Sequence, residues 1–341
     1  MSASSPLVEI DDLTIQYETA QGMLTAVSDA SLSIDREEFY GLVGESGCGK
    51  STLAHSIIGG LDDNARIASG TIRFDGTEIQ DFSEKEFNRK IRWKEISWIP
   101  QGSMSSLDPL ERVSDQAHEV VRAHTDMKKQ ETKQRLGDLF EVMGLQRNRI
   151  SEYPHQLSGG MKQRAIIALA LILEPSVVIA DEPTTALDVI TQDQIFKYLD
   201  KIKETTETTL LLITHDISVV LESCDKMAVM HSGQVAETAT TTALYDEPHH
   251  PYSFLLQQAF PDHRYPDRTL NVIEGIPPQT IGEVTECTFA SRCPWATEEC
   301  TASAPTLEPV GGDEDHEAAC FRTEAVRADI EHEGIKSEVN D

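Results

Sequence analysis

The sequence has few basic residues, few aromatic residues and no long apolar run. Lysine and arginine number 29 against 58 acidic residues, which gives a formal net charge of −29. This excess disfavours nucleic acid as a partner, because a phosphate backbone binds to cationic surfaces. It favours a salt-rich cytosol such as a halophile's, where ions screen the self-repulsion. The longest apolar run, residues 165–173, is about half of the ~20 residues that cross a membrane, so no span is predicted.

Cysteine is also scarce. Six cysteines in 341 residues are too few for a disulfide-dense secreted scaffold. The first residues, Met-Ser-Ala-Ser-Ser-Pro, lack a basic segment followed by an apolar stretch, so no export signal is expected. An apolar share of 39% disfavours a disordered or fibrous protein, and the length allows two or three domains.

Strand and helix patterns alternate along the first two thirds of the chain. Residues 7–17 and 24–34 alternate between apolar and polar side chains, which predicts an antiparallel pair. Residues 39–43 are apolar throughout, as in a strand buried on both faces. The later alternation predicts a parallel sheet covered by helices. The further predicted helices are 113–124, 129–143, 159–173, 189–203 and 217–223, and the further predicted strands are 176–181, 209–214 and 226–231.

Two regions depart from this alternation. Residues 83–144 are mostly polar and predict mainly helices. Past Gln234 several prolines break the chain, so we expect an appendix there rather than more sheet. Residues 311–341 carry ten acidic and three basic residues, and we expect the last ~20 residues to be loose.

A glycine loop follows the strand at residues 39–43. It reads Gly-Glu-Ser-Gly-Cys-Gly-Lys-Ser and fits G-x-x-x-x-G-K-S/T between a strand and a helix. Such a loop turns its N–H groups toward phosphate oxygens, Lys50 reaches the β- and γ-phosphates, and Ser51 holds Mg2+. The alternative is a glycine turn with a surface lysine. The predicted phosphate-binding residues are Gly44, Glu45, Ser46, Gly47, Cys48, Gly49, Lys50, Ser51 and Thr52.

Two adjacent carboxylates end a second buried strand. Asp181 and Glu182 follow Ser-Val-Val-Ile-Ala, and ligands of parallel α/β sheets bind at this end of the strands. Asp181 is predicted to bind Mg2+ through water, and Glu182 to polarise the attacking water. The alternative is a charge pair at a helix N-terminus.

A Leu-Ser-Gly-Gly stretch opens the helix predicted at 159–173. Ser158 is a suitable N-cap, and Gly159 and Gly160 leave the first N–H groups uncovered. With Lys50, this stretch and Asp181 in that order along the chain, residues 7–238 resemble the ATP-binding subunits of ABC transporters. The resemblance implies an α/β P-loop NTPase (RecA-like) core at residues 1–240, with an antiparallel β subdomain and a helical subdomain at about 103–153.

The resemblance also implies roles for single residues. Gln101 would contact Mg2+ and the γ-phosphate, and His215 would sense the γ-phosphate, so that Glu182, His215 and Gln101 form the catalytic set. Asp188 would cross the interface of a dimer. Tyr17 would stack on adenine, although a tyrosine on an edge strand can simply pack there. Gln163, in the Leu-Ser-Gly-Gly helix, is also assigned to the nucleotide site.

Members of this family act as head-to-tail pairs. ATP would lie between residues 44–51 of one ATPase and Ser158-Gly159-Gly160 of a second, identical or related one. The implied partners are two membrane permease subunits, docked near Gln101 and residues 103–153, and indirectly an extracellular solute-binding protein. The protein would lie at the cytoplasmic face of the membrane. A soluble ATPase switch is the alternative, but long coiled-coil insertions, a second nucleotide domain and a basic surface are missing from the sequence.

The segment at residues 241–341 points to one branch of the family. His249-His250-Pro251-Tyr252-Ser253 and the later Gly-Ile-Pro-Pro resemble the C-terminal extension of peptide and nickel importer ATPases. Uptake of di- or oligopeptides is therefore expected, with nickel and oligosaccharides as alternatives.

Four cysteines in this extension are spaced C-x5-C-x6-C-x19-C. Without a C-x2-C pair, the spacing alone is a weak metal signal. The peptide importer branch carries a similar pattern that binds a 4Fe-4S cluster, so the resemblance implies a structural cluster. Zinc and free or disulfide-linked thiols remain alternatives, and nothing in the sequence favours redox control. The four residues are Cys287, Cys293, Cys300 and Cys320.

Overall fold

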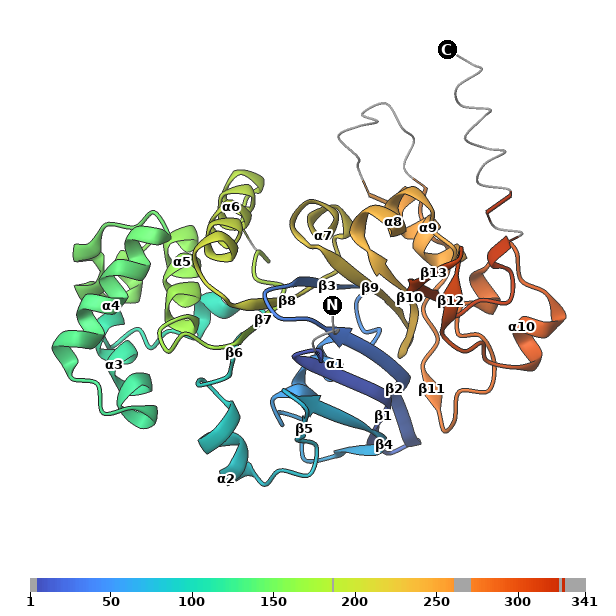
Figure 1. The fold of residues 1–341 in the computed structure, drawn as a ribbon, viewed down its shortest axis with the longest axis horizontal. Helices are drawn as coiled ribbons and strands as arrows, with labels where there is room; N and C mark the ends of the chain where they lie inside the picture. The colour runs from blue at the N-terminus through green and yellow to red at the C-terminus, as the bar shows by residue number, and fades with distance from the viewer. Residues whose placement is uncertain (1–4, 186, 261–270, 325–326, 329–341) are drawn as a thin grey trace, which may run out of the picture. The chain divides into compact units, whose positions relative to one another are not determined.

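The computed structural model describes residues 5–185, 187–260, 271–324 and 327–328 (Figure 1). The chain divides into two compact units. The first comprises Met1–Ile34, Tyr40–Gln80 and Thr214–Asp341, and the second comprises Asp35–Phe39 and Asp81–Ile213. No helix in the described part of the chain is long and apolar enough to cross a bilayer. The prediction for the last ~20 residues falls mostly outside the described residues.

An antiparallel sheet forms one side of the first unit. β1 (Val8–Thr19) and β2 (Gly22–Ile34) pair along their length, which confirms the predicted pair. Ile10, Leu13 and Ile15 are at most 1% exposed, since one face of the sheet covers the core. The sheet order is β11-β2-β1-β4-β5, where the other strands are β4 (Ala65–Phe74), β5 (Thr77–Glu78) and β11 (Thr280–Ile281).

A second group of strands in the first unit leads to the glycine loop. β3 (Phe39–Val43), whose first residue belongs to the second unit, runs parallel to β9 (Lys226–His231). β10 (Gln234–Thr240), β13 (Asp313–Ala318) and β12 (Glu308–Val310) continue antiparallel from β9. The helices are α1 (Lys50–Ile57), α7 (Ile217–Ser223), α8 (Thr241–Asp246), α9 (Pro251–Gln258), η5 (Ala290–Arg292) and α10 (Glu298–Ala302).

The expectation that the sheet ends at Gln234 is wrong. β10 is buried along most of its length, and the extension adds β13 and β12 beyond it. The polar residues of β10 hid this strand from sequence analysis. Glu237 is fully buried, and its carboxylate accepts hydrogen bonds from the N–H groups of His249 and His250 and from Nε2 of His316. A polar residue with all its partners inside the fold can occupy a buried strand, and composition does not show this.

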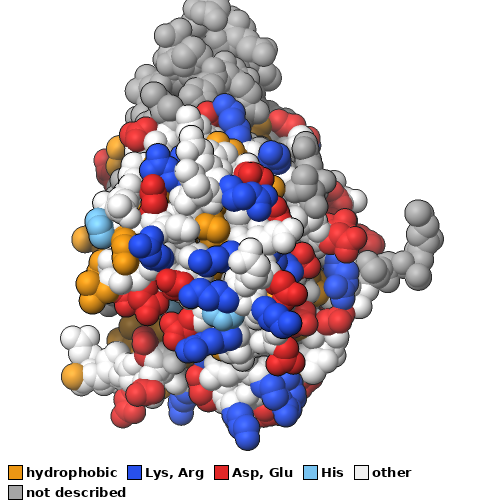
Figure 2. Space-filling view, turned by 90° about the vertical axis from the view of Figure 1, so that its left-hand side faces the viewer, with side chains coloured by type: hydrophobic (Ala, Val, Ile, Leu, Met, Phe, Trp, Pro, Cys, Tyr) orange, Lys and Arg blue, Asp and Glu red, His pale blue; other side chains and the backbone are white. Residues whose placement is uncertain are grey.

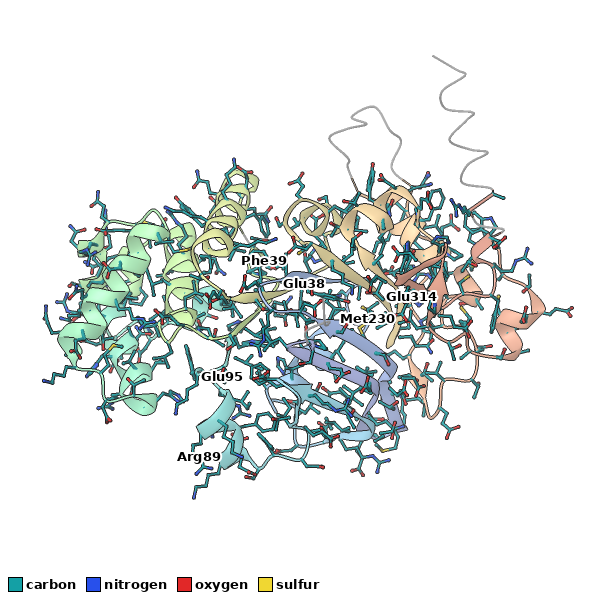
Figure 3. All side chains as sticks on the ribbon, in the orientation of Figure 1. Glu38, Phe39, Arg89, Glu95, Met230 and Glu314 are labelled. Carbon is teal, nitrogen blue, oxygen red and sulfur yellow. The ribbon has the colours of Figure 1, made fainter. Side chains whose placement is uncertain are left out.

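The described part of the second unit contains the parallel strands β6 (Ile96–Ile99), β7 (Val177–Asp181) and β8 (Thr209–Thr214), and the last residue of β8 belongs to the first unit. β6 interrupts the stretch predicted as mainly helical. Glu95, labelled in Figure 3, precedes β6, and its carboxylate accepts a hydrogen bond from Ser176 at 2.8 Å. The helices are α2 (Glu84–Glu86), η1 (Phe87–Ile91), η2 (Ser103–Ser105), α3 (Val113–His124), α4 (Lys129–Val142), η3 (Arg147–Ser151), η4 (Pro154–Gln156), α5 (Gly159–Ala170) and α6 (Val189–Thr205).

The helical part of the second unit does not share the acidity of the chain. Residues 103–153 contain nine acidic and eight basic residues. Figure 2 shows both signs interspersed on one face of the molecule. Pairs such as Lys129–Asp115 at 2.8 Å and Arg149–Glu152 at 2.8 Å belong to this segment. Its surface is therefore close to neutral, although the chain as a whole carries −29.

Candidate functional site

The loop predicted to bind phosphate, residues 44–51, connects β3 to α1 as expected. Gly49 is the N-cap of α1 with φ +104°, and Gly47 has φ +80°. A Cβ on Gly49 would lie 2.3 Å from the carbonyl oxygen of Ala26. A Cβ on Gly44 would lie 2.1 Å from that of Met230, which Figure 3 labels on β9. Only glycine allows the loop to lie this close to the neighbouring backbone.

Lys50 lies inside the loop. Its side chain is buried, and Nζ donates to the carbonyl oxygens of Gly44 at 2.7 Å and Glu45 at 2.8 Å. Cys48 is buried beside it, and burial raises the pKa of the Cys48 thiol. The cationic group is thus held within the loop whose N–H groups are expected to bind phosphate.

Tyr17 lies next to this loop. It is half-buried near the end of β1, and its hydroxyl is 3.4 Å from Oγ1 of Thr52 on α1. The ring is therefore within reach of a base whose phosphates lie in the loop. The assignment of Tyr17 to adenine stays a prediction.

Two residues missed by sequence reasoning, Tyr252 and Arg292, contact the loop, and a third, His231, lies beside Arg292. The hydroxyl of Tyr252 accepts from the N–H of Glu45 at 3.0 Å, and Arg292 pairs with the Glu45 carboxylate at 2.7 Å. Nε2 of His231 lies 3.2 Å from Nη1 of Arg292. Tyr252 and Arg292 are 207 and 247 residues from Glu45, so no local pattern could reveal these contacts.

The buried His231 side chain is expected to make the protein less stable at acidic pH. Burial, with the adjacent Arg292 cation, lowers the pKa of His231 to about 3, against about 6.5 in an unfolded chain. Well above pH 6.5 the ring is neutral in both states. As the pH falls below that value, only the unfolded state takes up the proton, so the free energy of unfolding falls by about 2 kcal/mol by pH 5. Urea titrations near pH 7.5 and near pH 5 measure the free energy of unfolding. Its decrease between the two pH values should be about 2 kcal/mol larger in wild type than in His231→Gln. An equal decrease in the free energy of unfolding of both proteins would contradict the lowered pKa of His231.

The second unit brings two predicted catalytic residues together. Asp181 is buried at the end of β7, and Glu182 follows it with φ +45°. One Glu182 carboxylate oxygen accepts from Nε2 of Gln101 at 2.8 Å and from the hydroxyl of Thr185 at 2.9 Å. These two donors hold the carboxylate of Glu182 in a fixed direction. Sequence reasoning did not include Thr185.

His215 belongs to the first unit and follows β8. Its side chain is exposed, and the next residue, Asp216, caps α7 by accepting from the N–H of Ser218 at 3.0 Å. The cap fixes the backbone beside the histidine. The γ-phosphate role of His215 stays a prediction.

The Leu-Ser-Gly-Gly stretch opens α5 as predicted. Ser158 is its N-cap, and Oγ accepts from the N–H of Met161 at 3.3 Å. Ser158 and Gly159 are exposed, whereas a Cβ on Gly160 would lie 2.6 Å from Cγ2 of Thr191. Gln163 faces inward. It is 2% exposed and accepts from the hydroxyl of Ser103 at 2.7 Å, so its assignment to the nucleotide site stays a prediction.

Asp188 has a structural partner within the chain. It caps α6, and its carboxylate accepts from the N–H and the hydroxyl of Thr191 at 3.0 and 2.8 Å. Its side chain is exposed, which leaves a contact with a second molecule open to test. The preceding Ala186 lies outside the described residues.

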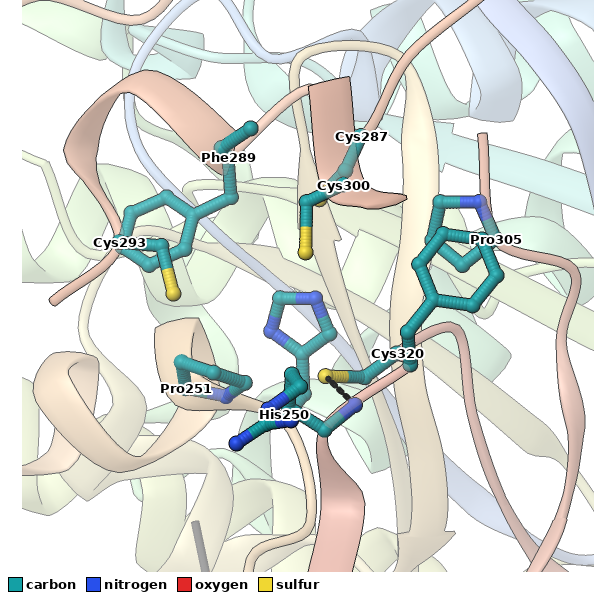
Figure 4. A pocket seen from close by; sticks show the side chains of 11 residues that line it. His250, Pro251, Cys287, Phe289, Cys293, Cys300, Pro305 and Cys320 are labelled. Carbon is teal, nitrogen blue, oxygen red and sulfur yellow. Dashed lines mark hydrogen bonds between the residues drawn. The ribbon is translucent and has the colours of Figure 1, made fainter. Parts of the chain in front are cut away.

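The four cysteines of the extension line one pocket (Figure 4). None of them is in a disulfide, and the N–H of Arg322 donates to Sγ of Cys320 at 3.2 Å. Burial raises the pKa of the Cys293 thiol to about 11 and that of Cys320 to about 12. The other lining residues are His250, Pro251, Phe289, Ala290, Pro305, Phe321 and Arg322. In the described ranges, no three His, Cys, Asp or Glu residues form a group that could hold a metal ion.

Comparisons with known proteins agree with this geometry. Residues 27–185 match the ABC transporter family, and residues 236–300 match the C-terminal region of oligopeptide and dipeptide transporters. The chain is 40% identical to the oligopeptide transport ATP-binding protein OppD of Escherichia coli, over 93% of each chain. It is 38% identical to the dipeptide transport ATP-binding protein DppD of the same organism, over 88% of this chain and 92% of the relative.

A solved structure gives the same fold. The dimeric, post-hydrolysis ATP-binding cassette MJ0796, bound to ADP and Pi, matches with a TM-score of 0.60 and 29% identity over 69% of this chain and 98% of its own. The predicted fold class, a P-loop NTPase core, is confirmed. The chain therefore belongs to the ATP-hydrolysing subunits of ABC transporters, in the branch that contains the oligopeptide and dipeptide transport ATPases.

Proposed function

We propose that this chain drives the uptake of dipeptides or oligopeptides, as the ATPase of an importer with two membrane permease subunits. The observation that carries the proposal is the match of residues 236–300 to the C-terminal region of oligopeptide and dipeptide transporters. That segment includes most of β10 and all of α8 and α9, and Tyr252 on α9 contacts the phosphate-binding loop. We take residues 1–240 as the ATP-binding domain and 241–341 as the extension.

ATP is proposed to lie between two ATPase subunits. Lys50, Ser51 and Asp181 would hold its phosphates and Mg2+ on one subunit, and the exposed N-terminus of α5 would close the site from the other. Bare N–H groups at a helix N-terminus favour an anion, and Ser158 and Gly159 are exposed. The similar cassette MJ0796 is itself dimeric.

The helical part of the second unit is proposed to dock the permease at the inner face of the membrane. The charges of residues 103–153 are nearly balanced, so this surface repels an approaching negatively charged protein less than the acidic remainder of the chain does. Leu110, just before α3, is 84% exposed. An exposed leucine on a near-neutral surface suits a contact with another protein better than the acidic surfaces do.

The four-cysteine pocket is proposed to hold a 4Fe-4S cluster through Cys287, Cys293, Cys300 and Cys320. The residue type fits, because thiolates bind such clusters and all four thiols line one pocket, although among the described residues no three of them form a group that could hold a metal ion in this structure. Burial disfavours these thiolates without a cation, which the iron would supply. Bound there, the cluster would cross-link the loops of the extension. Zinc remains the alternative.

Uptake by a reconstituted complex tests the transport function. This ATPase and its permease are incorporated into vesicles, and entry of a labelled dipeptide, a labelled pentapeptide, nickel and a labelled oligosaccharide is compared. We expect ATP-dependent entry of a peptide, and its loss in Glu182→Gln. Glu207→Gln, which changes an exposed glutamate before β8, should transport as wild type does. Entry of nickel or oligosaccharide alone would refute the substrate class, and failure to assemble with a permease would refute the importer.

A further inference from the structure

We propose that Arg292 and Tyr252, both in the C-terminal extension, are positioning residues of the nucleotide site that hold the phosphate-binding loop in its ATP-binding shape through Glu45. The inference rests on the proposed binding of ATP at residues 44–51. It assigns the extension a direct part in ATP binding, in addition to any part in transport.

The guanidinium of Arg292 has a partner for each of its five N–H groups. Two of them pair with the two oxygens of the Glu45 carboxylate, at 2.7 and 2.9 Å. The others reach the carbonyl oxygens of Glu274 at 2.9 Å and Ile273 at 3.4 Å, and Nε2 of His231 at 3.2 Å. The Arg292 side chain is 4% exposed. A guanidinium fixed on every side, in a site shielded from water, sets the position of the carboxylate it binds.

Glu45 is held at its backbone as well as its side chain. Its N–H donates to the hydroxyl of Tyr252 at 3.0 Å, and Tyr252 is fully buried. Its carbonyl oxygen accepts from Nζ of Lys50 at 2.8 Å and from the N–H of Cys48 at 3.3 Å. Arg292 and Tyr252 therefore fix the residue whose carbonyl oxygen binds Nζ of Lys50. A shift of Glu45 moves Lys50 and the turn that presents the loop's N–H groups.

The same two residues adjoin the four-cysteine pocket. Arg292 precedes Cys293, and Tyr252 follows Pro251, which lines the pocket. Phe289, also in the lining, packs against Tyr252 with ring centroids 5.3 Å apart. A single layer of residues, which includes Arg292 and Tyr252, therefore lies between the four-cysteine pocket and the phosphate-binding loop. Damage to the pocket is therefore expected to weaken ATP binding at the loop.

The test measures binding of a fluorescent ATP analogue with Mg2+ to the full chain, and steady-state ATP hydrolysis. Arg292→Met should raise Kd by about tenfold or more, because Glu45 keeps its charge and loses its partner. KM for ATP should rise similarly, while kcat at saturating ATP stays within about twofold. Arg292→Lys should recover part of the affinity, since it restores the charge without the two parallel bonds. Tyr252→Phe, which removes only the hydroxyl, should raise Kd in the same direction.

The matched control is Arg327→Met. Arg327 also lies in the extension and pairs with Glu247 at 3.0 Å, with 41% of its side chain exposed, so its loss should leave ATP affinity unchanged. Glu45→Gln should weaken binding, and the double variant with Arg292→Met should lose less than the two single losses together. Wild-type Kd in both Arg292→Met and Tyr252→Phe, or additive losses, would overturn the inference. No analogue binding by the wild type would instead refute the proposed ATP site, and the inference with it.

Discussion

Glu182→Gln is expected to lower the rate of ATP hydrolysis by a factor of about 10²–10⁴ and to leave ATP binding unchanged. A carboxylate can accept the proton of the attacking water, whereas an amide of the same size cannot. The Glu182 carboxylate accepts hydrogen bonds from Gln101 and Thr185, so the base is already oriented. Steady-state hydrolysis and binding of a fluorescent ATP analogue measure the two effects separately.

The control for this variant is Glu207→Gln, a change of an exposed glutamate that should hydrolyse ATP at the wild-type rate. With Mg-ATP, Glu182→Gln should also elute from a gel filtration column as a dimer, because the γ-phosphate that joins two subunits persists. Steady hydrolysis by this variant would refute the assignment of the base. A monomer that retains its nucleotide would refute the shared site.

Loss of iron is the second large effect that we expect. Protein purified without oxygen should carry about four iron atoms per chain, and Cys320→Ser should lose most of them together with the visible absorbance. Sγ of Cys320 accepts from the N–H of Arg322, a bond to sulfur that suits a ligand thiolate. Iron analysis and absorption spectra provide the measurement.

Cys224→Ser is the matched control, because Cys224 is a buried cysteine that is in no disulfide and does not line the pocket. It should retain the full iron content. An iron-free wild-type protein, or one that carries stoichiometric zinc, would contradict the cluster. Protease digestion adds a second readout. If the cluster cross-links the extension, Cys320→Ser should be cut faster than Cys224→Ser within residues 271–324.

Much of the fold could be predicted where buried apolar runs have clear limits. β8, α7 and β9 begin and end where the sequence places them, and the loop before Lys50 lies where its motif requires. The strands β4 and β11 were not predicted. β4 has an irregular pattern of polar and apolar residues, and β11 has only two residues, whose pairing with β2 depends on tertiary packing.

Some residues of the candidate site could likewise be predicted from the sequence, and others could not. Motifs identified Lys50, Asp181 and Glu182 because their chemistry requires fixed residue types at fixed spacing. Gln101, which donates to the Glu182 carboxylate, was also predicted, whereas the residues that hold Glu45 were not identifiable. Tyr252 and Arg292 reach Glu45 across more than 200 residues, and nothing in a histidine-proline-tyrosine turn or an arginine before a cysteine specifies that contact. Contacts of this kind follow from the folded chain and not from local sequence.

The pairing of β11 with β2 and of β13 with β10 has a consequence for solubility. Each pairing covers part of a sheet edge, since β11 pairs with Leu24 and Thr25 on the outer side of β2 and β13 pairs with Glu237 and Thr238 on the outer side of β10. An uncovered edge offers free N–H and C=O groups to the strands of other molecules. A chain that ends before the extension would leave backbone groups at both places without a strand partner, so we expect it to aggregate more readily than the full chain.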